Sequence, residues 1–72
     1  MKTIARYEAN GKKQWLELYE TEFNGKLSYE YSGTKCGGNI GYKNSPQDAI
    51  QSFEINQVQY LKMDYPSTKR VF

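Results

Sequence analysis

Residues 14–23 read Gln14-Trp15-Leu16-Glu17-Leu18-Tyr19-Glu20-Thr21-Glu22-Phe23, and an Asn-Gly pair stands on each side, at residues 10–11 and 24–25. Asn-Gly tolerates positive φ at both central positions of a type I′ turn, which joins the two strands of many β-hairpins. A strand between two such turns is the middle strand of a meander. Residues 14–23 therefore predict an antiparallel sheet with residues 3–9 and 26–31 as the neighbouring strands.

Turns with two-residue loops also predict the register of both hairpins. In the first hairpin Ala5 is expected opposite Leu16. In the second hairpin Leu18 is expected opposite Tyr31. Side chains alternate between the two faces of a strand, so this register decides which residues share a face.

One face of the predicted meander is almost continuously apolar and aromatic, which is typical of a core face. Its residues are Ala5, Tyr7, Leu16, Leu18, Leu27, Tyr29 and Tyr31. The opposite face, which we call the outer face, mixes aromatic and charged side chains. A second element is therefore expected to cover the first face alone.

The segment of residues 32–44 is rich in glycine, and glycine this dense weakens any regular element. We expect a bulged end of the third strand, a loop near Gly37 and Gly38, and a short fourth strand around residues 40–42.

Ser45-Pro46-Gln47-Asp48 is the clearest helix start, because Ser caps the first turn and Pro suits the first helical position. We expect a helix from Pro46 to about Ile55, ended by Asn56 and packed on the core face. Residues 57–65 alternate in polarity and predict a last strand that Pro66 ends.

The sequence thus predicts an α+β fold: an antiparallel meander of four or five strands with one helix on one face. The expected order along the chain is three strands, a short fourth strand, the helix and a last strand. The predicted domain covers residues 1–66, and residues 67–72 are expected to form a flexible basic C-terminal tail.

Composition argues against several classes of function. The chain has 72 residues, one Cys, no His and a net charge of +2. One cysteine forms no internal disulfide, and without His a zinc site lacks its usual ligands and a reaction lacks its commonest general base. No apolar run is long enough for a membrane span. We expect a cytoplasmic, non-enzymatic protein without cofactor or metal.

Two groups of residues suggest catalysis only weakly. Cys36 precedes two glycines, but a thiol nucleophile needs a base or a cationic neighbour to activate it. The glutamates of the central strands are expected to be solvated charges of the sheet rather than a catalytic pair. We therefore interpret both groups as structural.

The outer face holds the candidate binding residues. Trp15, Tyr19 and Phe23 recur at every fourth position of the middle strand, so they point to the same side. Three further residues are expected beside them on this face: Ile4, Arg6 and Lys13, the last opposite Glu8. An aromatic patch rimmed by charges is the composition of a protein-binding surface.

Other functions could use the same aromatic residues. They could stack on single-stranded nucleic acid, although neighbouring acidic groups offset the cations. They could also form a homo-oligomer interface, so both monomer and homodimer are open. In size and layout the chain resembles the small inhibitor proteins of phages and mobile elements, including anti-CRISPR proteins. That resemblance implies an inhibitor that occupies the surface of a host protein, such as one in a nucleic-acid-associated complex.

Overall fold

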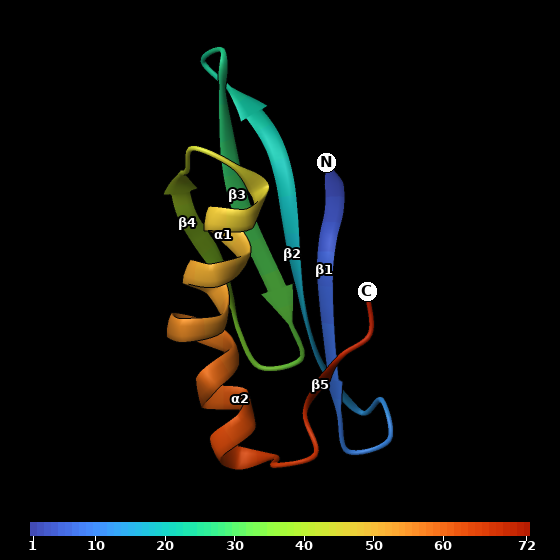
Figure 1. Cartoon of the computed structure of the whole chain (residues 1–72). Coiled ribbons are helices and arrows are strands. Elements are labelled where there is room, and N and C mark those ends of the chain that lie inside the picture. Colours follow the sequence, from blue (N-terminus) through green and yellow to red (C-terminus); the bar gives the residue numbers. More distant parts are fainter.

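The computed structural model describes residues 1–72, and it has the α+β architecture that the sequence predicts (Figure 1). A five-stranded antiparallel sheet has the strand order β4-β3-β2-β1-β5. The strands are β1 (Lys2–Ala9), β2 (Gln14–Phe23), β3 (Lys26–Gly33), β4 (Gly37–Tyr42) and β5 (Lys69–Arg70). One helical rod then packs against this sheet.

The hairpin of β2 and β3 confirms the predicted register. Leu18 lies opposite Tyr31 and Glu22 lies opposite Leu27. The turn between the strands has positive φ at Asn24 (54°) and at Gly25 (74°), as a type I′ turn requires.

The first hairpin has a different register. Tyr7, rather than Ala5, lies opposite Leu16. The reason is a wider loop over residues 10–13, in which the backbone N–H of Lys13 donates to the carbonyl of Asn10 at 3.2 Å. A shift of two residues leaves the side chains from Ala5 to Ala9 on their expected faces, because strand side chains alternate with period two.

Two predicted members of the outer face are misplaced. Lys13 lies in the loop before β2, and Trp15 takes its expected place opposite Glu8. The pairing of β1 with β2 also slips between Thr3 and Ala5, which marks a bulge at Ile4. The bulge turns the Ile4 side chain inward, where it packs against the core.

β4 is longer than predicted and begins where a loop was expected. Gly37 and Gly38 are its first residues, and the chain reverses before them over residues 34–36. A Cβ at Gly38 would stand 3.0 Å from the Tyr31 hydroxyl, so the missing side chain lets β4 lie close to that ring. A second bulge lies where β3 and β4 shift register between Tyr29 and Glu30, and Gly41 beside it has a φ of 80°.

The helix begins as predicted and continues far beyond its predicted end. The Oγ of Ser45 accepts a hydrogen bond from the N–H of Asp48 at 3.1 Å. The rod consists of α1 (Pro46–Phe53), a π-helical turn η1 (Glu54–Val58) and α2 (Gln59–Asp64). The strand predicted over residues 57–65 is therefore wrong.

The π-helical turn explains this error. Ala49, Phe53, Val58 and Leu61 face the core, so successive core residues are separated by four, five and three positions. A spacing of five breaks the 3.6-residue period of an α-helix, and a π turn absorbs the extra residue. The spacing of apolar residues therefore stops fitting an α-helix near Asn56, although the helical rod continues to Asp64.

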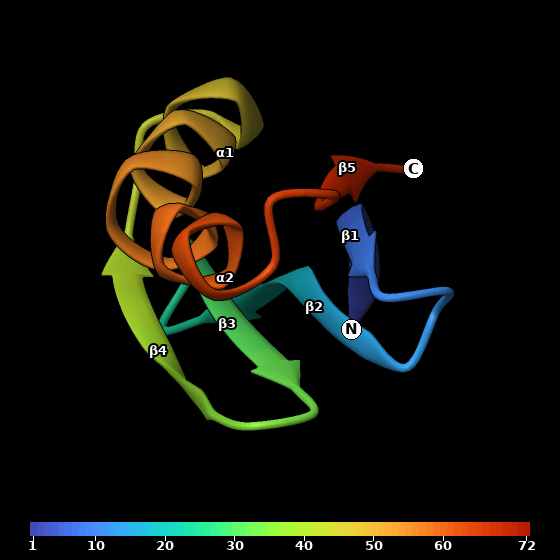
Figure 2. The same ribbon diagram turned by 90° about the horizontal axis from the view of Figure 1, so that it is seen from below.

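The core lies between the helix and one face of the sheet, which curves around the helix (Figure 2). Phe53 packs against two tyrosine rings, Tyr7 at 5.7 Å and Tyr31 at 5.4 Å between ring centroids. The Tyr7 hydroxyl also donates to Glu54 on the helix at 2.7 Å. The predicted core face is confirmed, although Leu27 on this face is exposed.

The segment that we expected to be a flexible tail supplies the fifth strand. Lys69 and Arg70 form β5 and pair with Glu8 and Tyr7 of β1. The N–H of Val71 then donates to the carbonyl of Arg6 at 2.8 Å. The last strand therefore lies here rather than at residues 57–65.

Candidate protein-binding surface

The outer face is the side of the sheet turned away from the helix. The residues that pairing and alternation place on it include Thr3, Arg6, Glu8, Trp15, Glu17, Tyr19, Thr21, Phe23, Lys26, Ser28, Glu30, Ser32, Asn39 and Tyr42. No helix or second sheet covers this side (Figures 1 and 2). Four of the six predicted site residues lie on it, namely Trp15, Tyr19, Phe23 and Arg6.

Trp15 lies beneath the guanidinium of Arg6, whose Cζ is 4.8 Å from the centroid of the ring. Two carboxylates hold that guanidinium in place. Its Nε donates to Glu8 at 2.9 Å and its Nη1 donates to Glu17 at 2.7 Å. Trp15 is therefore partly buried and held in one orientation, with a cation–π contact above it.

A row of hydrogen bonds continues from Glu17 to β3. The Tyr19 hydroxyl donates to the second oxygen of Glu17 at 2.5 Å and lies 3.0 Å from the Ser32 Oγ. Together with the Arg6 contacts, this row connects β1, β2 and β3 across the outer face. We call Glu8, Arg6, Glu17, Tyr19 and Ser32 the polar row.

In the polar row the pKa values of Arg6, Glu17 and Tyr19 are shifted. The hydrogen bond from Tyr19, followed by that from Arg6, lowers the pKa of Glu17. Hydrogen bonds to Glu8 and Glu17 raise the pKa of Arg6. Burial, followed by the hydrogen bond to Glu17, raises the pKa of Tyr19. At neutral pH the row carries one cation between two carboxylates, so the middle of the outer face has no surplus of positive charge.

Apolar side chains are exposed at the far end of the β2–β3 hairpin. This end projects past the start of the helix and past the N-terminus of β1 (Figure 1). On the outer face Phe23 is 60% exposed and Tyr42 47%. Leu27, which pairs with Glu22 and lies on the opposite face of the hairpin, is 38% exposed. Lys26 lies with its Nζ 5.7 Å from the Tyr42 ring centroid, and Lys43 lines the same shallow hollow. We call these five residues the distal patch.

Sequence reasoning missed two residues of this patch. The face of Leu27 was predicted correctly but its exposure was not expected, and the face of Tyr42 was not assigned. The length of β2 could have indicated the exposure of Leu27, because a helix starting at Pro46 leaves the tip of a ten-residue strand uncovered. For Tyr42 there was no signal, because its face depends on the bulge in β4.

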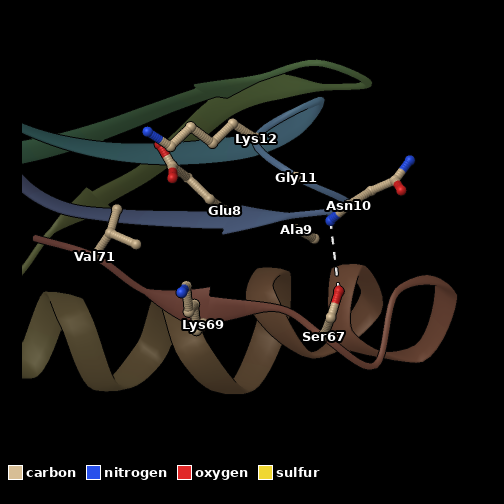
Figure 3. A pocket seen from close by; sticks show the side chains of 8 residues that line it. All are labelled: Glu8, Ala9, Asn10, Gly11, Lys12, Ser67, Lys69 and Val71. Atoms are coloured by element: carbon tan, nitrogen blue, oxygen red, sulfur yellow. Dashed lines mark hydrogen bonds between the residues drawn. The ribbon is translucent and has the colours of Figure 1, made fainter.

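A wider hollow of about 570 Å³ lies between the β1–β2 loop and the segment before β5. Figure 3 shows Glu8 and Lys12 on one side of it and Lys69 on the other, with a hydrogen bond of 3.5 Å from the Asn10 amide to Ser67. Its lining is mainly polar and open to solvent. No group of three or more His, Cys, Asp or Glu side chains lies close enough to hold a metal ion.

Comparisons with protein-family models, with curated proteins and with solved structures find no match for this chain. Neither helical segment has the length and hydrophobicity needed to cross a membrane.

Proposed function

We propose that this chain is a small non-enzymatic protein-binding module whose partner docks on the outer face, from Trp15 to the distal patch. One observation carries the proposal: the helix covers a single face of the sheet, and the exposed aromatic side chains of Phe23 and Tyr42 lie on the other face. Exposed apolar surface rimmed by polar residues commonly marks a binding site on a monomer.

The side chains of this surface are suited to a binding interface. Trp, Tyr and Arg dominate the residues that contribute most to protein–protein affinity. Arg6 and the polar row already hold Trp15 and Tyr19, so binding would order few additional side chains. Phe23 and Tyr42 supply apolar area that a partner could bury, and Lys26 lies between them.

The finer proposal is an inhibitor of the phage or mobile-element type, anti-CRISPR-like, which acts by occupying its partner's surface. What supports it is the size of the chain, its layout and the lack of a catalytic constellation on this face. The partner would be a host protein, for example in a nucleic-acid-associated complex. The single exposed thiol fits a reducing compartment, so we propose a cytoplasmic location.

The test begins with affinity capture from a lysate of the native cell, followed by purification of the captured protein and calorimetric titration with the pure chain. We expect a 1:1 complex that Trp15→Ala and Phe23→Ser each weaken at least about tenfold. Ile55→Ser is the matched control, because Ile55 is 58% exposed on the helix and Phe23 is 60% exposed on the sheet.

A complex that tolerates both outer-face substitutions but is lost on Ile55→Ser would place the interface on the helix and refute the proposal. The two other functions of the same residues have their own signatures. Binding to an oligothymidine that falls steeply with salt would indicate nucleic acid. A mass that rises with protein concentration and returns to one chain on Phe23→Ser would indicate a homo-oligomer.

A further inference from the structure

A second, smaller pocket lies where the start of β2, the reversal before β4 and the second half of the helix meet. Its volume is about 150 Å³. Trp15, Leu16, Tyr60 and Leu61 line it with mainly apolar surface, and Gln57 is also among the lining residues. Trp15 thus borders this pocket, and its side chain lies on the outer face beneath Arg6.

Gln57 is the unusual member of the lining. Its Oε1 is the one buried side-chain oxygen or nitrogen atom that has no hydrogen-bond partner. An unpaired buried acceptor is costly, and native proteins contain few of them. Gln57 reaches this position because it lies within the π-helical turn, where Val58 takes the core position that an α-helix would give to residue 57.

Charged groups stand at the rim of the pocket. The Nζ of Lys35 lies 3.9 Å from a carboxylate oxygen of Asp64 and 4.9 Å from the ring centroid of Tyr65. Both charged side chains are more than half exposed, so they can rearrange around an incoming chain at little cost. The rim is therefore polar and the walls are mainly apolar.

We infer that this pocket is the anchor site for one tyrosine side chain of the protein partner. A volume of about 150 Å³ suits a single aromatic ring, whereas sites for larger ligands span roughly 300 to 1,000 Å³. Apolar walls take the ring, and the phenol O–H donates to the unpaired Gln57 oxygen. The inference rests on the proposed function, because it assigns a partner residue to a site that adjoins the same surface.

The probe is p-cresol, which is the side chain of tyrosine as a free molecule, and p-xylene is the same shape without a donor. Trp15 is the single tryptophan of the chain and borders the pocket, so its fluorescence and its indole N–H signal in NMR spectra report on changes at the pocket edge. We expect p-cresol to shift the Trp15 and Gln57 side-chain signals in a saturable way.

Gln57→Met keeps the length of the side chain, and Met is as good a helix former as Gln, but the substitution removes the hydrogen-bond acceptor. It should weaken p-cresol binding about five- to tenfold, as loss of one hydrogen bond predicts, and leave p-xylene binding unchanged. Gln59→Met is the matched control, because it makes the same change at an exposed position of the helix.

Three results would overturn the inference: no saturable shift at Trp15 or Gln57, equal weakening by both methionine variants, or a partner complex that Gln57→Met leaves intact although p-cresol binds. These outcomes leave the proposed function standing if Phe23→Ser still weakens the complex. Failure of the proposed function would instead appear as a partner complex that the outer-face substitutions do not weaken, whether or not p-cresol binds.

Discussion

At the scale of single residues, the polar row is the feature with the clearest chemistry. Arg6 places one cation against Glu8 and Glu17, and Tyr19 adds a hydroxyl donor to Glu17. These ion pairs lie partly buried at the surface of the sheet, and surface ion pairs contribute little to stability by themselves. Their larger effect is to hold the Trp15 ring in a defined orientation.

We predict that Glu17→Gln makes stability less sensitive to acid. The folded-state pKa of Glu17 lies below its unfolded value, so its contribution is present above the unfolded pKa and is lost as pH falls through the folded pKa. Denaturant unfolding at about pH 7 and about pH 3 should show a smaller loss for Glu17→Gln than for wild type. Glu22→Gln, at an exposed carboxylate without a hydrogen bond, is the control and should behave as wild type.

We predict that Gly33→Ala destabilises the protein by about 1 to 3 kcal/mol, the usual cost of overpacking. A Cβ at Gly33 would stand 2.5 Å from both the Leu16 Cδ2 and the Trp15 carbonyl oxygen. The same change at Gly37 meets its nearest atom, the Tyr31 carbonyl oxygen, at 3.3 Å and should cost less. Thermal unfolding of the two variants compares them, and equal midpoints would contradict this account.

At the scale of elements, the helix is shaped by its π-helical turn. Without the extra residue, the core positions would be spaced by four, four and three, which is the pattern of an ordinary amphipathic α-helix. The turn therefore maintains the contact of α2 with the sheet at the cost of an unpaired Gln57 oxygen. Such turns often occur at functional sites, in agreement with the anchor pocket.

We predict that deletion of Asn56 is tolerated, because it restores the regular spacing of core residues and changes stability by only about 1 to 2 kcal/mol. Deletion of Gln59 is the control. It would leave Val58 and Leu61 two positions apart, on different sides of the helix, and should cost about 2 to 5 kcal/mol. Circular dichroism and denaturant unfolding distinguish the two variants, and an unfolded Asn56 deletion would refute the explanation.

At the scale of the whole molecule, the architecture has two layers, the helix and the sheet. The molecule is elongated, with extents of 37 × 19 × 19 Å, because the β2–β3 hairpin projects beyond the helix. The C-terminal segment adds an edge strand to the sheet by pairing with β1. This leaves the outer face and the distal patch as the uncovered parts of the sheet.

We predict that Val71→Pro loosens β1. Proline has no backbone N–H, so the hydrogen bond from residue 71 to the Arg6 carbonyl is lost. Amide hydrogen exchange at Arg6 and Tyr7 should accelerate, and stability should fall by about 1 kcal/mol. Val71→Ala keeps the N–H and is the matched control. Unchanged exchange in Val71→Pro would mean that the segment is as mobile as the sequence suggested.

The sequence predicted the meander, the core face and the helix start correctly, and each error has a local cause. The first register failed because the loop after Ala9 is wider than a type I′ turn. The strand predicted over residues 57–65 is wrong because the π-helical turn interrupts the α-helical spacing of core residues, so the segment resembles the alternating polarity of a strand. Among the candidate site residues, Ile4 and Lys13 were misplaced because a bulge and a loop are invisible to period-two counting.

The sequence by itself determined what depends on a few neighbouring residues: the turn at Asn24-Gly25, the cap at Ser45 and the alternation that separates the two faces of β2. Only the tertiary structure decided what depends on contacts between distant segments. The pairing of β5 with β1, the reach of the helix and the pocket beside Gln57 belong to this group. Local rules act over one turn or one strand, whereas these features follow from how segments far apart in the chain fill a shared core.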